Sequence, residues 1–497
     1  MSVFYTNVEK YGNKIYWRGY ENGKAFFRKE VFSPTLFVPS ENGDWRSFID
    51  NVPVAPKKFD TMKDAKEFLE RYSDVGNYNI YGTTSFAWQF IQERFPDDIT
   101  FDSNKINIFA FDIEVDISTG YPDIDKADKP LTSIAAKSSK RSTHFLFGLK
   151  DYDKQITETG VDPDDILYLK CESEEDLILK FLKIWKYEYP EIVTGWNVEL
   201  FDVRYLINRI KRIFGESKAN ELSPWGRIRD RIVPDHGKKI DSYEISGMTI
   251  VDYMEAFKKF GYKYGTLESY KLDHVSYIVL GEKKLSYDEY GNLTNLYNEN
   301  PQKYLDYNLK DTALIERLEN QTALIQLVMT LAYKSGTNYR DAFGTTGKWE
   351  STIYRKLMEK KLAPPIKKEP GEKADLLGGH VKEPVPDMYD WIVTFDLASL
   401  YPHLMLQYNM SPETYLPDVV ENTSQEMILE GSYVNKDKSK SVAANGVCFT
   451  NEKLGLIPEI IEQYYNERKE VKRKMLDKES KIEKIKEEIK RRSKNVG

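Results

Sequence analysis

The feature that most constrains the fold of this 497-residue chain is a short apolar run that leads into two acids. Residues 106–111 (INIFAF) have the length and the β-branched and aromatic content of a buried strand. Asp112 and Glu114 follow, two residues apart, so a strand would present both carboxylates on one face. One interpretation is that both side chains point into water where the strand ends. The other is that they share Mg²⁺ or Mn²⁺, because hard oxygen ligands suit these ions and a cation removes the repulsion between the acids.

Two later stretches favour the cation interpretation. Residues 192–197 read as a second apolar strand running into a turn, which leads to Asp202 at the start of a helical pattern. Residues 304–314 have a helical pattern that places Tyr307 and Asp311, four residues apart, on one face. The acids on separate elements of one predicted α/β unit are then Asp112, Glu114, Asp202 and Asp311. Such a set can hold two metal ions about 4 Å apart for in-line attack on a phosphodiester.

Four stretches, in this order, resemble known motifs. FDIE at residues 111–114, TGWNVELFD at 194–202 and YNLKD at 307–311 resemble the three exonuclease motifs of family B DNA polymerases. FDLASLYP at residues 395–402 resembles the first palm motif of that family. The likeness is to the replicative polymerases of large tailed bacteriophages and extends to about residue 475. It implies an α/β multidomain fold: an RNase H-like exonuclease domain, an antiparallel N-terminal domain and an incomplete palm and fingers.

The resemblance also divides the chain into parts. Residues 1–103 and 325–367 would form the N-terminal domain, 104–324 the exonuclease domain, 368–455 a partial palm and 456–497 the first half of the fingers. Independently, the alternating pattern of residues 3–38, broken at Gly12-Asn13 and Asn22-Gly23, predicts a small antiparallel sheet.

A turn at residues 234–237 separates two extended runs, 229–233 and 242–251. In the family, a β-hairpin at this position helps to move the primer end between two active sites. A plain surface hairpin is the alternative interpretation.

For the exonuclease site, the resemblance implies roles for the acids. Asp112, Glu114 and Asp311 would bind the metal that activates water. Asp112 and Asp202 would serve a second metal that stabilises the leaving 3′-oxygen. The expected cofactor is therefore Mg²⁺ or Mn²⁺, two ions per exonuclease site.

Other residues would contact the substrate. Tyr307 would orient the attacking water through its hydroxyl, and Tyr121 could stack on the terminal base. Gly378 and Gly379 lie where a glycine-containing loop of the family touches the template backbone; a simple turn is the alternative.

The palm motif predicts a third buried strand, residues 391–395, ending in Asp396. By resemblance, Asp396 would be one of two palm carboxylates that hold the catalytic metals, and the backbone of Leu397 would also reach a metal. Tyr401 would stack under the incoming sugar. The residues implied to bind the nucleotide here are Ser399, Leu400 and Tyr401.

Residues 458–494 contain no glycine and no internal proline and read as one long helix. Its apolar residues follow a narrow seam suited to one partner helix: Val471, Met475, Ile482, Ile485 and Ile489. Arg468 and Lys472, four residues apart, match the finger residues that hold the triphosphate of the incoming nucleotide. A solvated charged helix is the alternative for residues 477–494.

The sequence contains no Y-G-D-T-D-S or similar stretch after the first palm motif. Since nucleotidyl transfer needs two metals held by acids from both palm motifs, we expect the chain alone not to polymerise. A split polymerase, in which a second chain supplies the remaining palm, fingers and thumb and reaches a sliding clamp, would account for this; a gene fragment would look identical. The alternatives are a non-catalytic scaffold that binds template, and an independent repair nuclease.

The net charge of −7 gives no overall positive field, although a local basic groove suffices for DNA. Two cysteines are too few for a disulfide framework and fit a reducing cytoplasm. No run of about 18 apolar residues predicts a membrane span. The expected partners are primer-template and single-stranded DNA, a dNTP and the second chain, in the cytoplasm of an infected bacterial host.

Overall fold

The computed structural model describes residues 3–72, 75–76, 78–235, 238–366 and 383–494. These residues form two compact units. The first unit contains Met1–Leu36, Lys57–Val75 and Thr83–Arg355, and the second contains Phe37–Pro56, Gly76–Gly82 and Lys356–Gly497. The four-part domain division made from the sequence stays a prediction.

The chain begins with an antiparallel sheet in the order β1-β2-β3: β1 (Val3–Tyr11), β2 (Lys14–Glu21) and β3 (Lys24–Val31). Gly12, Asn22 and Gly23 have φ angles of 56°, 51° and 75° in its two turns, which the Gly-Asn and Asn-Gly pairs accommodate. The predicted sheet is confirmed. Two helices follow, α1 (Met62–Tyr72) and α2 (Phe86–Arg94).

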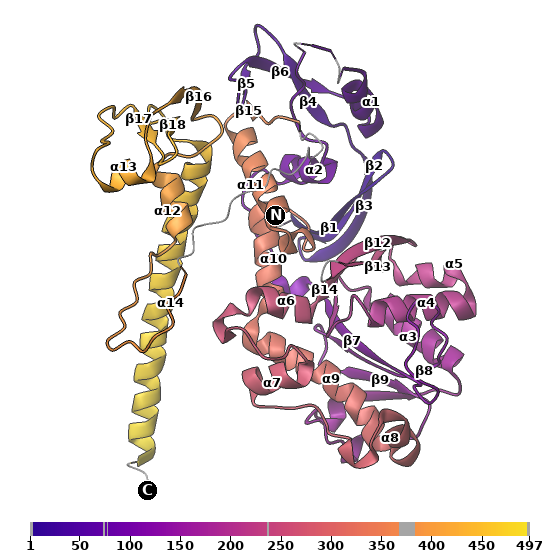
Figure 1. Cartoon of the computed structure of the whole chain (residues 1–497). Helices are drawn as coiled ribbons and strands as arrows, with labels where there is room; N and C mark the ends of the chain where they lie inside the picture. The colour runs from indigo at the N-terminus through magenta and orange to yellow at the C-terminus, as the bar shows by residue number, and fades with distance from the viewer. Residues whose placement is uncertain (1–2, 73–74, 77, 236–237, 367–382, 495–497) are drawn as a thin grey trace. The chain divides into compact units, whose positions relative to one another are not determined.

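A six-stranded sheet, in the order β10-β9-β8-β7-β11-β14, forms the centre of the first unit (Figure 1). Its strands are β7 (Ile108–Val115), β8 (Leu131–Ser138), β9 (His144–Gly148), β10 (Ile166–Lys170), β11 (Ile192–Gly195) and β14 (Thr249–Asp252). Strand β8 is antiparallel to β7 and β9, whereas β11 is parallel to both β7 and β14. The strand predicted to end before Asp112 continues to Val115, because β8 pairs with it along this whole length.

Helices cover both faces of this sheet. On one face, Phe181 and Trp185 of α3 (Glu174–Glu188) pack against Phe109 and Phe111 of β7. On the other face, α9 (Pro301–Thr322) packs against β8 and β9. The remaining helices around the sheet are α4 (Asp202–Phe214), α5 (Glu216–Ala219), α6 (Tyr253–Phe260), α7 (Leu272–Leu280) and α8 (Leu293–Glu299).

The predicted hairpin is present as β12 (Ile228–Asp235) paired antiparallel with β13 (Lys238–Ile245). The second predicted run is divided, since residues 249–252 join the central sheet as β14. His236 and Gly237, in the predicted turn, lie outside the described residues.

Helix α10 (Leu324–Ser335) and most of α11 (Thr345–Glu359) complete the first unit, which ends at Arg355. The Tyr333 hydroxyl donates to the Tyr5 carbonyl at 2.6 Å, so α10 is attached to β1. Within the described residues, none of the helices combines the length and the apolar character that a membrane span requires.

The second unit is built mainly from two small sheets and three helices. One sheet has the order β15-β5-β6-β4, and the other has the order β16-β18-β17. Their strands are β4 (Thr35–Pro39), β5 (Trp45–Ser47), β6 (Pro53–Lys58), β15 (Leu362–Ala363), β16 (Tyr415–Val420), β17 (Lys440–Val442) and β18 (Val447–Thr450). The helices are α12 (Leu400–Gln407), α13 (Gln425–Leu429) and α14 (Leu456–Lys494). The last, yellow in Figure 1, confirms the predicted long helix.

The buried strand predicted at residues 391–395 is wrong. These residues are not in a strand, and Trp391 and Phe395 are 97% and 91% exposed. A strand needs a hydrogen-bonded neighbour and a covered face, and no described strand pairs with this segment.

Candidate active site

Three carboxylates from two elements converge at the central sheet. Asp112 and Glu114 point to one face of β7, and Asp311 lies on α9, which packs against that sheet. Each offers one oxygen within 4.8 Å of the others, a spacing at which one metal ion could be held. The side-chain amide of Asn308 donates to Asp112 Oδ2 at 2.7 Å and fixes that carboxylate. Neither residue type nor spacing had singled out Asn308, which one turn of α9 places beside Asp311.

Asp202 lies beside this cluster at the first residue of α4. It is buried, and its Oδ1 accepts a hydrogen bond from the backbone N–H of Ile113 at 3.1 Å. Ile113 separates Asp112 from Glu114, so the fourth predicted acid reaches the same strand as the first two. Burial and the neighbouring charge of Asp112 raise the pKa of Asp202 well above its ordinary value.

The turn before α4 explains this placement. Gly195 ends β11 so close to β7 that an added Cβ would lie 2.7 Å from the Phe111 carbonyl oxygen. The buried carboxylate of Asp252 accepts hydrogen bonds from the backbone N–H groups of Asn197 and Glu199 at 3.2 and 3.1 Å. Asp252, which was not predicted as a functional residue, therefore fixes the turn that positions Asp202.

The cluster carries negative charge that the protein only partly balances. The pKa of Asp112 is raised to about 8, first by burial and second by the charge of Asp311. Burial and the charges of Asp112 and Asp311 raise the pKa of Glu114 in the same way. Asp311 Oδ1 is buried and has no hydrogen-bond partner among the described residues. Hard oxygen ligands, mutual repulsion and a vacant buried acceptor all fit a divalent cation.

One cation of the protein itself enters the cluster. Lys284 Nζ lies 2.6 Å from Asp311 Oδ2 and 4.4 Å from the centre of the Tyr307 ring. Tyr307 is one turn before Asp311 on α9, as the YNLKD spacing predicted. Lys284 was missed because it lies in an irregular segment, where a lysine has no periodic pattern to mark it.

All four acids line one cleft with about 750 Å³ of empty space. Tyr121 is on its wall and is 91% exposed, so its ring is free to meet a base. A second hollow of about 1720 Å³ shares Trp196, Asn197, Lys284 and Tyr307 with this cleft. It adds cationic and aromatic side chains: Lys258, Tyr270, Lys271, Lys283 and Tyr287. Cations beside aromatic rings that line a hollow suit a single nucleic-acid strand.

The residues predicted for nucleotide transfer lie in the second unit. Asp396 and Leu397 are exposed, and Leu400 and Tyr401 begin α12 after Ser399, whose φ is 56°. Arg468 and Lys472 are exposed on one face of α14. The ring of His403 on α12 meets that of Tyr465 on α14 at 4.6 Å. Among the described residues, Asp396 belongs to no group of three or more His, Cys, Asp or Glu side chains that could hold a metal ion. The predicted template contacts Gly378 and Gly379 lie outside the described residues.

Comparison with known proteins identifies the family of this chain. The sequence model of the exonuclease domain of DNA polymerase family B matches residues 83–275, which include three of the four acids. A second model, of DNA polymerase family B itself, matches residues 342–491. The chain belongs to DNA polymerase family B. Its exonuclease domain is RNase H-like, and the predicted family and fold class are confirmed.

This family B chain is similar to two phage proteins over 98% of its length. It is 30% identical to the DNA-directed DNA polymerase of Escherichia phage RB69 and 30% identical to that of Enterobacteria phage T4. It is also 28% identical to the DNA polymerase delta catalytic subunit of Dictyostelium discoideum, over 60% of this chain and 27% of that protein. The chain spans 56% of the length of each of the two phage proteins.

Proposed function

We propose that this chain carries a metal-dependent 3′→5′ exonuclease that removes nucleotides from single-stranded DNA ends during replication. The observation that carries the proposal is the convergence of Asp112, Glu114 and Asp311 within 4.8 Å, in a domain of the family B exonuclease type. The activity would serve proofreading, because separating a frayed or mispaired 3′ end from the template costs less free energy than separating a matched end.

The acids would hold Mg²⁺ or Mn²⁺, in two sites per exonuclease centre. Asp112, Glu114 and Asp311 would bind one ion, and Asp112 with Asp202 would serve the other. When bound, the ions supply positive charge that activates water and stabilises the leaving oxygen.

The other side chains orient the reactants. The Tyr307 hydroxyl orients the attacking water, and Asn308 keeps Asp112 aimed at the cluster. Lys284, already beside Asp311, can pair with an oxygen of the scissile phosphate. Tyr121 stacks on the terminal base at the exposed wall of the cleft.

The second unit would contribute to nucleotide incorporation on a primer-template. Asp396 and the backbone of Leu397 would reach the palm metals, and Ser399–Tyr401 with Arg468 and Lys472 would bind the dNTP. Gly378 and Gly379 would touch the template. The remaining palm, fingers and thumb, and the contact with a sliding clamp, would be supplied from outside residues 1–497, in the cytoplasm of the infected bacterium; the split polymerase and the gene fragment both satisfy this.

A digestion assay tests the exonuclease. The Asp112→Ala, Glu114→Ala double variant should lose Mg²⁺-dependent release of nucleotides from a 3′-labelled single strand, as should the wild type in EDTA. Asp116→Ala is the matched control, because that carboxylate lies just beyond β7 and accepts from the Ser118 N–H instead. Undiminished digestion by the double variant would reject the site. DNA binding without any digestion by the wild type would favour the template-binding scaffold.

A further inference from the structure

The segment that carries Lys284 has no regular structure of its own. Helix α7 ends at Leu280, Gly281 turns the chain with φ +72°, and residues 282–287 are neither helix nor strand. A side chain on such a segment keeps its position only if other contacts fix the backbone. Lys284 nevertheless reaches both Asp311 and Tyr307, so something outside the segment must hold it.

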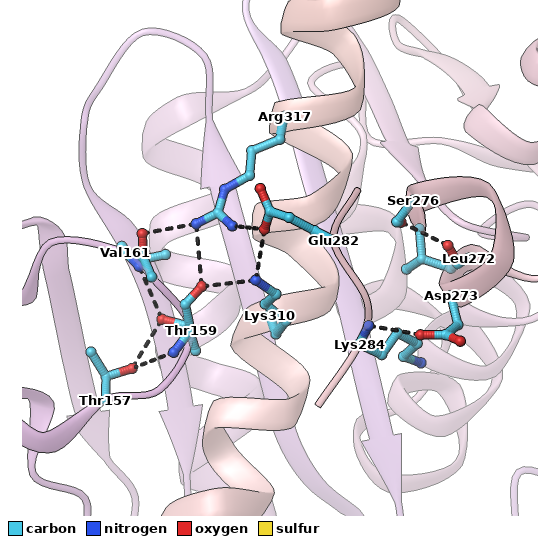
Figure 2. A network of polar contacts seen from close by, with 11 residues as sticks. Thr157, Thr159, Val161, Leu272, Asp273, Ser276, Glu282, Lys284, Lys310 and Arg317 are labelled. Atoms are coloured by element: carbon cyan, nitrogen blue, oxygen red, sulfur yellow. Dashed lines mark hydrogen bonds and ion pairs between the residues drawn. The ribbon is translucent and has the colours of Figure 1, made fainter. Parts of the chain in front are cut away.

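Two anchors fix the segment, and both are visible in Figure 2. The backbone N–H of Lys284 donates to Asp273 Oδ1 of α7 at 2.8 Å. Two residues earlier, Glu282 Oε2 accepts a hydrogen bond from Lys310 Nζ at 2.9 Å and pairs with Arg317. Lys310 and Arg317 are two turns apart on α9. Glu282 thus joins the segment to the same helix that carries Tyr307 and Asp311.

The two cations of this clamp are themselves fixed. Lys310 Nζ donates to the Thr159 carbonyl at 3.1 Å, and Arg317 donates to the Gly160 carbonyl at 2.8 Å. The Lys310 side chain is only 9% exposed. A nearly buried ammonium needs its carboxylate partner, which distinguishes this clamp from an ordinary surface ion pair.

We propose that Glu282 is a positioning residue of the exonuclease: its clamp on Lys310 and Arg317 holds residues 282–287 against α9 and so keeps Lys284 at Asp311 and Tyr307. The inference rests on the proposed function and deepens it. Among the described residues, Glu282 pairs with Lys310 and Arg317 rather than with a predicted metal ligand. Its effect on the reaction passes through Lys284, whose misplacement by about 1 Å can cost up to about 100-fold in rate.

The first test is kinetic. Glu282→Ala should lower kcat for single-strand digestion about 10-fold and leave KM within about twofold, because positioning acts on the chemical step. Glu282→Gln, which retains an oxygen acceptor for Lys310 and Arg317, should recover part of the rate. Glu289→Ala is the matched control: Glu289 also pairs with a lysine of α9, Lys303, but at the first turns of the helix. It should leave kcat unchanged.

A double-mutant cycle separates positioning from general stability. If Glu282 acts through Lys284, adding Glu282→Ala to Lys284→Met should cause little further loss of kcat. Losses that multiply, or an unchanged kcat in Glu282→Ala, would overturn the proposal.

A second readout does not depend on nuclease activity. Lys284 should react slowly with an amine-acylating reagent in the wild type because Asp311 holds it, and severalfold faster in Glu282→Ala, as measured by peptide mass mapping. Glu289→Ala should keep the wild-type rate. Unchanged acylation of Lys284 in Glu282→Ala would overturn the inference, whereas a wild type that digests no DNA would overturn only the proposed function.

Discussion

Asp112 occupies a position where losing its proton is costly. Its pKa is raised from 3.8 to about 8, since burial and the charge of Asp311 both disfavour the carboxylate. The stability associated with this group is fully present below pH 3.8 and is lost as the pH rises toward 8. Glu114, Asp202 and Asp311 shift in the same direction and add to the effect. At the residue scale, the acidic cluster proposed to hold a cation destabilises the metal-free fold.

The metal-free protein should therefore become less stable as the pH is raised from 6 to 8. The free energy of unfolding should fall by about 1.4 kcal/mol per pH unit for each proton that the folded state retains and the unfolded state does not. Thermal unfolding in EDTA across this range measures it, and added Mg²⁺ should restore stability at pH 8. A melting temperature that rises with pH in EDTA would contradict the assignment.

Asp112→Asn should raise the stability of the metal-free protein while abolishing digestion. The amide keeps an oxygen for the Asn308 hydrogen bond but removes one charge from the cluster. The gain in free energy of unfolding should be about 0.5–2 kcal/mol at pH 8, the usual range for a single stabilising substitution. Urea unfolding in EDTA measures it, with Asp116→Asn as the control. A destabilised Asp112→Asn would show that the cluster is not repulsive.

At the element scale, Gly195 decides how closely β11 approaches β7. A Cβ there would lie 2.7 Å from the Phe111 carbonyl oxygen and 3.0 Å from Val198 Cβ. Gly195→Ala should therefore destabilise the protein by about 1–3 kcal/mol and shift the turn that delivers Asp202. Gly344→Ala, whose Cβ would lie 3.4 Å from the Asp341 carbonyl oxygen, is the control. Equal unfolding midpoints for the two variants would contradict this account.

The helices and strands also show which predictions from sequence patterns succeed and which fail. Helix α14 and the sheet β1–β3 were predicted because their signals, periodicity and turn residues, are local. The strand predicted at residues 391–395 was wrong, since an apolar run becomes a strand only beside a partner. Strand β7 extended past its predicted end for the same reason: β8 pairs with it to Val115.

At the scale of the whole molecule, the acidic cluster lies entirely within Thr83–Arg355 of the first unit. Chymotrypsin should cut first after Trp391 and Phe395, which are 97% and 91% exposed, whereas the buried Trp17 and Trp185 resist. The N-terminal product should keep Mg²⁺-dependent digestion, assayed after gel filtration. Loss of digestion on cleavage would mean that the second unit takes part in the exonuclease.

The polypeptide of residues 1–497 should digest a primer strand but not extend it. Asp396 belongs to no group of three or more metal-ligand side chains among the described residues, and the sequence of residues 403–497 contains no second palm motif, whereas transfer needs acids from both motifs. A primer-extension gel with all four dNTPs and Mg²⁺ measures both activities at once. Extension by this polypeptide alone would show that acids of a second palm motif are not required.

The sequence by itself determined the family and singled out four acids, because its motifs place Asp112, Glu114, Asp202 and Asp311 at the ends or faces of local elements. Only the tertiary structure decided which side chains surround them. Asn308 meets Asp112 from 196 residues away, and Lys284 reaches Asp311 from an irregular segment that Glu282 clamps to α9. Periodicity describes the face of one element, whereas burial, ion pairing and the pKa of an acid depend on contacts between elements distant in sequence.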